Sequence, residues 1–96
     1  MQSEFSEPYG VAIDPRNGNI IVSDSGNNRI RLINITSGNV STIAGNGTQG
    51  YLDGPALQSE FHYPSGVVID PTNSNIIITD SGNNRIALLG KFIYFI

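Results

Sequence analysis

The 96-residue sequence contains no cysteine, no tryptophan and a single histidine. Without cysteine the chain cannot build a disulfide framework, a thiolate zinc site or a cysteine nucleophile. Its one histidine, His62, excludes a metal site to which a single chain supplies several histidine ligands. We therefore expect neither a metal nor any other cofactor.

Charged residues are also scarce, at 14% of the chain, and the net charge at pH 7 is −3. Non-specific nucleic-acid binding depends largely on Lys and Arg contacts to phosphates, so this balance argues against a nucleic-acid partner. No apolar run approaches the roughly 20 residues that a membrane-spanning helix needs. The N-terminal seven residues carry two acids and no apolar segment, unlike a secretory signal. We expect no membrane partner, and the compartment remains open.

The residue types present favour strands over helices. Ile and Val supply 19 residues, whereas Ala and Leu, the good helix formers, supply nine. β-Branched side chains suit a pleated, half-buried surface. No window of ten or more residues shows the 3.6-residue apolar period of a helix, and Gly, Pro and Asn recur between the apolar runs. The chain is predicted to be all-β.

An internal repeat dominates the sequence. Residues 3–33 reappear at 59–89, an offset of 56, with 21 identities over 31 positions. The longest shared run, Asp-Ser-Gly-Asn-Asn-Arg-Ile, occupies residues 24–30 and 80–86. Self-similarity at a period near 50 is typical of propellers and solenoids, in which one repeat cannot bury its faces alone.

Each repeat is predicted to hold four short antiparallel strands. They occupy residues 10–14, 19–24, 29–35 and 39–44, then 66–70, 75–80, 85–89 and 91–96. Between the first two, Asn17-Gly18 is the pair preferred in a two-residue type I′ turn, where both residues have positive φ. The tail 91–96 does not resemble 40–44, so it reads as a degenerate outer strand, with a disordered or truncated end as the alternative.

Four antiparallel strands per period make one propeller blade. Residues 1–96 are therefore interpreted as a single propeller segment: blade 1 at about 8–44, an inter-blade loop at about 45–63, and blade 2 at about 64–96.

These residues resemble the NHL repeat family of β-propellers. The resemblance rests on Phe5-x-x-Pro8-x-Gly10 and on two further segments, residues 18–24 and 26–30, all repeated 56 residues later. It implies a propeller that usually closes with about six blades. Members of the family bind proteins, bind RNA or serve as receptor modules, and related propellers act as metal-dependent hydrolases or lyases. Fold alone does not decide among these functions.

Two blades cannot close a ring, because each outer flank would present apolar faces and unpaired strand edges. We expect several copies to assemble, with three chains supplying about six blades as a cyclic trimer.

The charged residues beside the shared turn form two candidate pairs, Asp24 with Arg29 and Asp80 with Arg85. We interpret them as structural, since Asp can accept backbone N–H bonds and Arg can donate to carbonyls. Recurrence once per blade fits that role, although a symmetric ring of binding sites would recur in the same way.

Candidate partner-binding residues lie in the loops, because propeller loops commonly carry the contacts. They are Tyr51, Asp53, His62, Tyr63, Asn27 and Asn83. The loop also contains a G-x-G-x-x-G pattern at 45–50, but Gly54-Pro55 follows and would break the helix that phosphate binding needs.

The sequence therefore predicts a non-enzymatic NHL-type scaffold for protein or ligand binding, with no catalytic residues. Two alternatives are a metal-dependent lactonase- or lyase-like propeller and an RNA-binding NHL module. The first needs inward-facing acids or histidines on the first strands, where residues 11–13 and 67–69 carry only Val, Ala and Ile. The second needs a basic face, and the chain has five basic residues.

Overall fold

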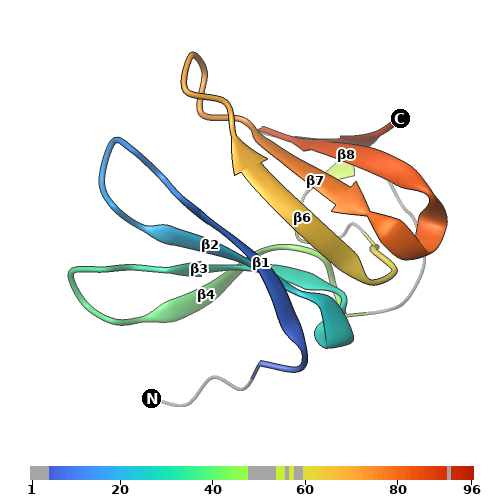
Figure 1. Ribbon diagram of the computed structural model, residues 1–96, viewed down its shortest axis with the longest axis horizontal. Coiled ribbons are helices and arrows are strands. Elements are labelled where there is room, and N and C mark those ends of the chain that lie inside the picture. Colours follow the sequence, from blue (N-terminus) through green and yellow to red (C-terminus); the bar gives the residue numbers. More distant parts are fainter. Residues whose placement is uncertain (1–4, 48–53, 56, 58–59, 91) are drawn as a thin grey trace.

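The computed structural model of the protein describes residues 5–47, 54–55, 57, 60–90 and 92–96. These residues form two antiparallel sheets joined side by side (Figure 1). The all-β prediction is confirmed. No helix in the described part of the chain is long and apolar enough to cross a membrane.

The first sheet holds four strands in sequence order. They are β1 (Pro8–Ile13), β2 (Ile20–Asp24), β3 (Arg29–Ile33) and β4 (Val40–Ala44). A single 3₁₀ turn, η1 (Ser25–Asn27), joins β2 to β3. This meander is the four-stranded unit that the repeat predicted.

The second sheet repeats the first and adds one short strand. Its strands are β6 (Pro64–Ile69), β7 (Ile76–Asp80), β8 (Arg85–Leu89) and β9 (Phe92–Phe95), with the turn η3 (Ser81–Asn83) between β7 and β8. The tail of the chain thus forms a fourth strand, β9, paired with β8. The two-residue β5 (Gly54–Pro55) pairs with β9, so this sheet has five strands and not the predicted four. Strand β5 thus covers the edge of β9 that would otherwise be unpaired.

The β1–β2 hairpin turn differs from the prediction. Asp14 N donates to Asn19 O at 2.8 Å, which leaves four residues in the loop and not two. Gly18 has φ +79°, whereas Asn17 is not among the positive-φ residues. The type I′ prediction was wrong because Pro15 holds φ near −65° and sets up a wider turn, with the left-handed residue in its last position.

The same closure recurs twice. Asn34 N donates to Asn39 O at 2.9 Å and Asp70 N donates to Asn75 O at 2.8 Å. Gly38 and Ser74 then occupy the left-handed position with φ +78° and +65°. In all three turns the Asp or Asn side chain at the first position accepts a hydrogen bond from the backbone N–H two residues later, so the turns share this contact and not one particular dipeptide.

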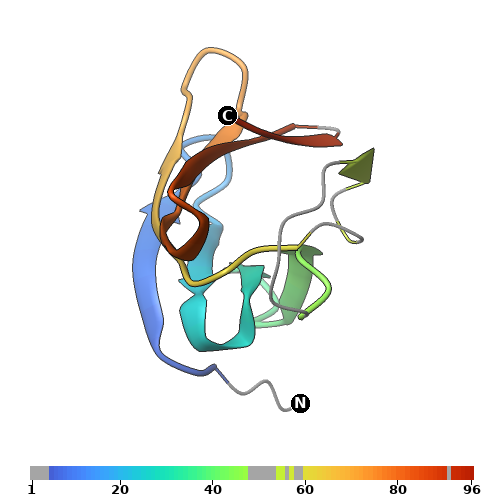
Figure 2. The ribbon, with the colours of Figure 1, turned by 90° about the vertical axis from the view of Figure 1, so that its right-hand side faces the viewer.

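One hydrophobic core spans both sheets. Strand β6 lies against β1 and β2, so that the innermost strands of the two sheets are neighbours (Figures 1 and 2). The core residues are Ile21, Ile30, Ala44, Phe61, Val67, Ile78, Ala87, Leu89 and Ile93. Phe61, fully buried just before β6, is the largest of them. Because the two blades pack side by side, the beginnings of the inner strands β1 and β6 lie close together.

Candidate functional site

A fully buried aspartate anchors the turn of the first blade. Asp24 is 0% exposed and ends β2. Its Oδ1 accepts a hydrogen bond from Ser6 N at 2.8 Å. Its Oδ2 accepts bonds from Asn27 Nδ2 and from Arg31 Nε, both at 2.9 Å. The carboxylate thus joins the segment before β1, the turn η1 and strand β3.

Asp80 performs the same task in the second blade and is also 0% exposed. It accepts bonds from His62 N at 2.8 Å, Asn83 Nδ2 at 2.8 Å and Arg85 Nη2 at 2.9 Å. Asn27 and Asn83, predicted as partner-binding residues, therefore direct their amides at the structural aspartates of their own turns.

The arginine that neutralises the aspartate differs between the blades. The predicted pair of Asp80 with Arg85 is present. The predicted pair of Asp24 with Arg29 is not, because Arg31 takes that place. Position 87, which corresponds to Arg31 in the repeat, is alanine, so the second blade uses the arginine two residues earlier. In the first blade Arg29 instead donates from Nη2 to Asn46 O at 3.2 Å.

A glycine in each turn allows the segment before the inner strand to pack closely. Gly26 N donates to Ser6 O at 2.7 Å, and a Cβ on Gly26 would lie 2.3 Å from Ser6 Oγ. In the second blade Gly82 N donates to His62 O at 2.7 Å. The residues that follow, Glu7 and Tyr63, adopt left-handed φ values of 51° and 53°. Both residues lie just before an inner strand, and both are exposed.

Three side chains of the first blade hold the start of β6. Ser23 Oγ donates to Ser65 O, and Ser25 Oγ donates to Pro64 O. Asn28 Oδ1 accepts a bond from Tyr63 N at 3.0 Å. These contacts fix the position of the second inner strand relative to the first turn.

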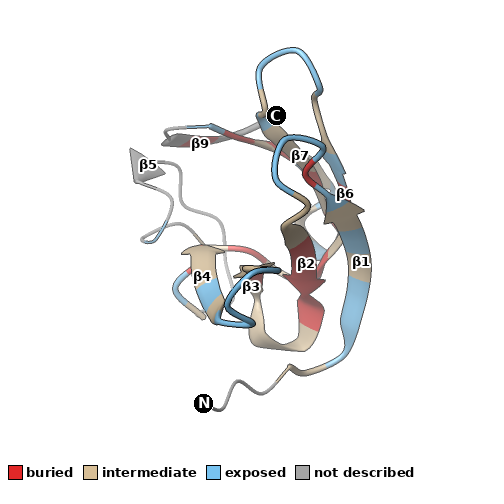
Figure 3. Cartoon of the chain, turned by 90° about the vertical axis from the view of Figure 1, so that its left-hand side faces the viewer, coloured by how far each residue is buried: buried red, intermediate tan, exposed pale blue. Residues whose placement is uncertain are grey.

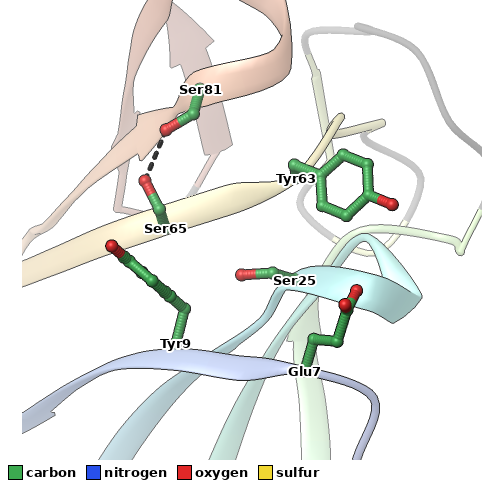
Figure 4. A pocket seen from close by; sticks show the side chains of 6 residues that line it. All are labelled: Glu7, Tyr9, Ser25, Tyr63, Ser65 and Ser81. Carbon is green, nitrogen blue, oxygen red and sulfur yellow. Dashed lines mark hydrogen bonds between the residues drawn. The ribbon is translucent and has the colours of Figure 1, made fainter.

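A pocket of about 360 Å³ lies at this junction. Its six lining side chains come from both blades and gather where β1 and β6 begin (Figure 4). They are Glu7, Tyr9 and Ser25 from the first blade and Tyr63, Ser65 and Ser81 from the second. These are three repeat positions taken twice, since each pair is 56 residues apart.

The pocket combines exposed aromatic rings with hydroxyl groups and one carboxylate. Tyr9 is 77% exposed and Tyr63 is 50% exposed. The hydroxyls of Ser65 and Ser81 hydrogen-bond to each other across the two elements (Figure 4). Glu7 is exposed and supplies the carboxylate of the lining. Such a surface can stack against a planar or cationic group and accept hydrogen bonds from it.

Of the predicted binding residues, Tyr63 lines this pocket and His62 lies beside it, with the two ring centroids 5.4 Å apart. Tyr51 and Asp53 lie outside the described residues. The three serines lie within the loop segments 25–28, 45–65 and 81–84, where a partner was expected from the sequence, whereas Glu7 and Tyr9 were missed. The available signal was that the residues on either side of Pro8 differ from those around Pro64, although the repeat is otherwise closely kept.

Two further aspartates, Asp14 and Asp70, hold the hairpin turns between the first two strands of each blade. The pKa of Asp14 lies below its ordinary value of 3.8. The largest cause is the hydrogen bond from the Arg16 side chain, whose Nη2 lies 2.9 Å from Asp14 Oδ2, and the second is the bond from the Arg16 backbone N–H. The pKa of Asp70 is also lowered, mainly by the hydrogen bond from the Thr72 hydroxyl and next by the bond from the Thr72 backbone N–H. In the described part of the chain, no three His, Asp or Glu side chains are grouped as a metal site would require.

The sequence profile of the NHL repeat matches residues 5–31 and 61–87, which together make up more than half of the chain. The chain belongs to the NHL repeat family. Among similar proteins, this NHL chain is 27% identical over 90 residues to NHL repeat-containing protein 2 of Gallus gallus, covering 93% of the chain and 12% of that protein. It is 31% identical over 85 residues to Protein SUPPRESSOR OF QUENCHING 1, chloroplastic, of Arabidopsis thaliana, covering 85% of the chain and 8% of that protein.

Among solved structures, the NHL chain is similar to an auxiliary nutrient binding protein from Bacteroides thetaiotaomicron. The TM-score is 0.73 at 29% sequence identity, and the match covers 95% of this chain and 23% of that one. The NHL chain therefore spans a small fraction of the length of these relatives. The resemblance to the NHL family is confirmed, and the two sheets correspond to propeller-type blades.

Proposed function

We propose that this NHL chain is a non-enzymatic propeller scaffold which, assembled in a ring, binds a partner at the pocket between its blades. The observation that carries the proposal is the distribution of differences between the two repeats. The buried aspartates that anchor the two turns, Asp24 and Asp80, are the same in both repeats. Two of the three repeat positions that line the pocket differ, since Glu7 corresponds to Tyr63 and Tyr9 corresponds to Ser65.

The unchanged aspartates therefore belong to the scaffold, and the differing pocket residues form the proposed recognition surface. A buried carboxylate with hydrogen-bonded partners tolerates little change, because losing one partner leaves a charge uncompensated. Side chains that line an open pocket carry no such constraint and can vary to suit a ligand. Since the aspartates at positions 14, 24, 70 and 80 all serve turn contacts, they support a scaffolding role over an acid–base one.

The lining favours a partner that presents a lysine or arginine side chain. Tyrosine rings attract cations over their faces. The Glu7 carboxylate can accept a charge-assisted hydrogen bond, and serine oxygens can accept more. A volume of about 360 Å³ lies at the small end of the range for ligand pockets, enough for a side chain and not for a large cofactor. We therefore propose a protein or peptide partner that inserts a cationic side chain. The likeness to a nutrient binding protein of Bacteroides also supports binding over catalysis.

The test is an NMR titration with a tetralysine peptide, using the same peptide with acetylated side chains as the neutral probe. We expect amide shifts around Tyr9 and Tyr63 with tetralysine and none with the acetylated peptide. Glu7→Gln should weaken binding by about two- to fivefold, as expected for an exposed ion pair. Glu60→Gln makes the same charge change outside the pocket lining and should leave the affinity unchanged. Equal weakening by both variants would refute the proposed site.

A further inference from the structure

Residues that correspond in the two repeats differ in burial on the outer flanks of the molecule. Val67 is 8% exposed, whereas its counterpart Val11 is 66% exposed. In the opposite sense, Ile30 is 0% exposed and its counterpart Ile86 is 38% exposed. The two members of each pair are the same residue type at the same position of their blades. The difference therefore reflects the other blade, because Val67 and Ile30 belong to the core that the two sheets share, whereas Val11 and Ile86 do not belong to the core of the described residues. Strand β1 is mostly exposed along its length (Figure 3).

The polar groups that dock one blade on the other are also duplicated. Ser23, Ser25 and Asn28 hold the start of β6 within the chain. Their counterparts 56 residues later are Thr79, Ser81 and Asn84. These three residues line a hollow of about 380 Å³ on the outer flank of blade 2, together with Arg85, Ile86 and Ile96.

The matching half of this interface lies on the opposite flank of the same chain. Within the chain, the groups that blade 1 holds are Tyr63 N, Pro64 O and Ser65 O. Their counterparts are the backbone groups of Glu7, Pro8 and Tyr9, and all three of these residues are exposed. A second copy of this chain therefore carries the segment that fits the flank of the first.

We infer that the start of β1 in one copy docks on the outer flank of blade 2 in a second copy. Thr79 and Ser81 donate to the carbonyls of Tyr9 and Pro8, and Asn84 Oδ1 accepts from Glu7 N. This contact is head-to-tail, so it generates a ring if the rotation closes, and three copies supply about six blades. The inference rests on the proposal that the chain works within a ring, but not on what the pocket binds.

Two equivalent glycines supply a matched test. A Cβ on Gly10 would lie 2.2 Å from Ser65 O of the neighbouring blade. On Gly66 the nearest atom is the Thr79 hydroxyl oxygen at 3.0 Å, a side chain that can turn away. In the docked arrangement Gly66 would instead face the Tyr9 carbonyl of the second copy. Gly66→Ala should therefore fold but not assemble, whereas Gly10→Ala should damage the fold of every chain.

The experiment is sedimentation equilibrium combined with circular dichroism. The unaltered chain should reach about three times the mass of one chain, which is 10.3 kDa. Gly66→Ala should retain the spectrum and sediment as one chain. Asn84→Gly, which keeps the left-handed backbone (φ 54°) and removes only the amide, should weaken association about fivefold per contact.

Two results would overturn the inference. The first is a mass of 10.3 kDa at every concentration, because no second copy would then cover the flank. The second is an assembly that neither Gly66→Ala nor Asn84→Gly alters. Tetralysine binding uses the pocket within one chain, so it can still be measured on a single chain. Failure of assembly and failure of the pocket are therefore separate results.

Discussion

Arg31→Ala and Arg85→Ala each remove the ion pair of a fully buried aspartate, yet we expect them to lower the free energy of unfolding by different amounts. Both pairs have an N–O distance of 2.9 Å, and the two arginine side chains are 15% and 17% exposed. On the local geometry alone, the two losses would be equal. The difference comes from which second arginine is available.

Arg85→Ala should cost about 3–5 kcal/mol, the usual loss when one partner of a buried pair is removed. Position 87 is alanine, so strand β8 offers no substitute cation for Asp80. Arg31→Ala creates the situation that the second blade already shows, because Arg29 stands where Arg85 does. Arg29 can therefore replace the lost partner by giving up its bond to Asn46 O.

The cost of Arg31→Ala is then limited to two hydrogen bonds. These are the bond from Arg31 Nη1 to Thr42 Oγ1 at 3.0 Å and the exposed bond that Arg29 gives up. At about 0.5–1.5 kcal/mol each, they amount to about 1–3 kcal/mol. The double variant Arg29→Ala/Arg31→Ala has no substitute and should lose about as much as Arg85→Ala.

The assay is urea unfolding followed by far-UV circular dichroism, with free energies extrapolated to water for the three variants and for Arg29→Ala. Arg29→Ala alone should cost less than about 1 kcal/mol, because it removes one exposed contact. A double loss larger than the sum of the single losses would support the substitution. The reasoning is refuted if Arg31→Ala costs as much as Arg85→Ala, or if the two single losses in blade 1 simply add.

Two further predictions concern the core and the turns. Phe61→Ala should lower the free energy of unfolding by about 3–5 kcal/mol, because it empties a fully buried site. The control Ile35→Ala, at a side chain 56% exposed, should change the free energy of unfolding by less than about 0.5 kcal/mol. Similar urea midpoints for the two variants would contradict the assigned core. The pKa of Asp14 is lowered in the folded chain, so its contribution to stability is present above the ordinary value of 3.8 and is lost as the pH falls through the lower folded value. Asp14→Asn should therefore flatten the decline of melting temperature in that acid range, and parallel curves for the two proteins would show that the contact with Arg16 does not matter.

Much of the fold could be predicted because it depends on local chemistry. β-Branched runs separated by Asx, Pro and Gly residues marked the strands, and the 56-residue repeat marked two equivalent blades. The turn between β1 and β2 was less accurate. Asn17-Gly18 favours a tight turn in isolation, but Pro15 and the bond from Asp14 N to Asn19 O select a wider one.

The candidate site was harder to predict because its members are distant in sequence. Tyr63 was found as a loop aromatic, but Glu7 and Tyr9 join it only through the packing of β6 against β1. Nor could sequence spacing choose between Arg29 and Arg31 as the partner of Asp24. Both follow the same turn, and the choice depends on which side chain the strand directs toward the buried carboxylate.

By itself, then, the amino-acid sequence determined the strand type, the repeat and the family, because these follow from residue type and periodicity. Only the tertiary structure decided which flanks are open, which arginine neutralises each aspartate and which side chains meet at the junction. Those features depend on how one blade packs against the next, and that packing brings together residues separated by a whole repeat.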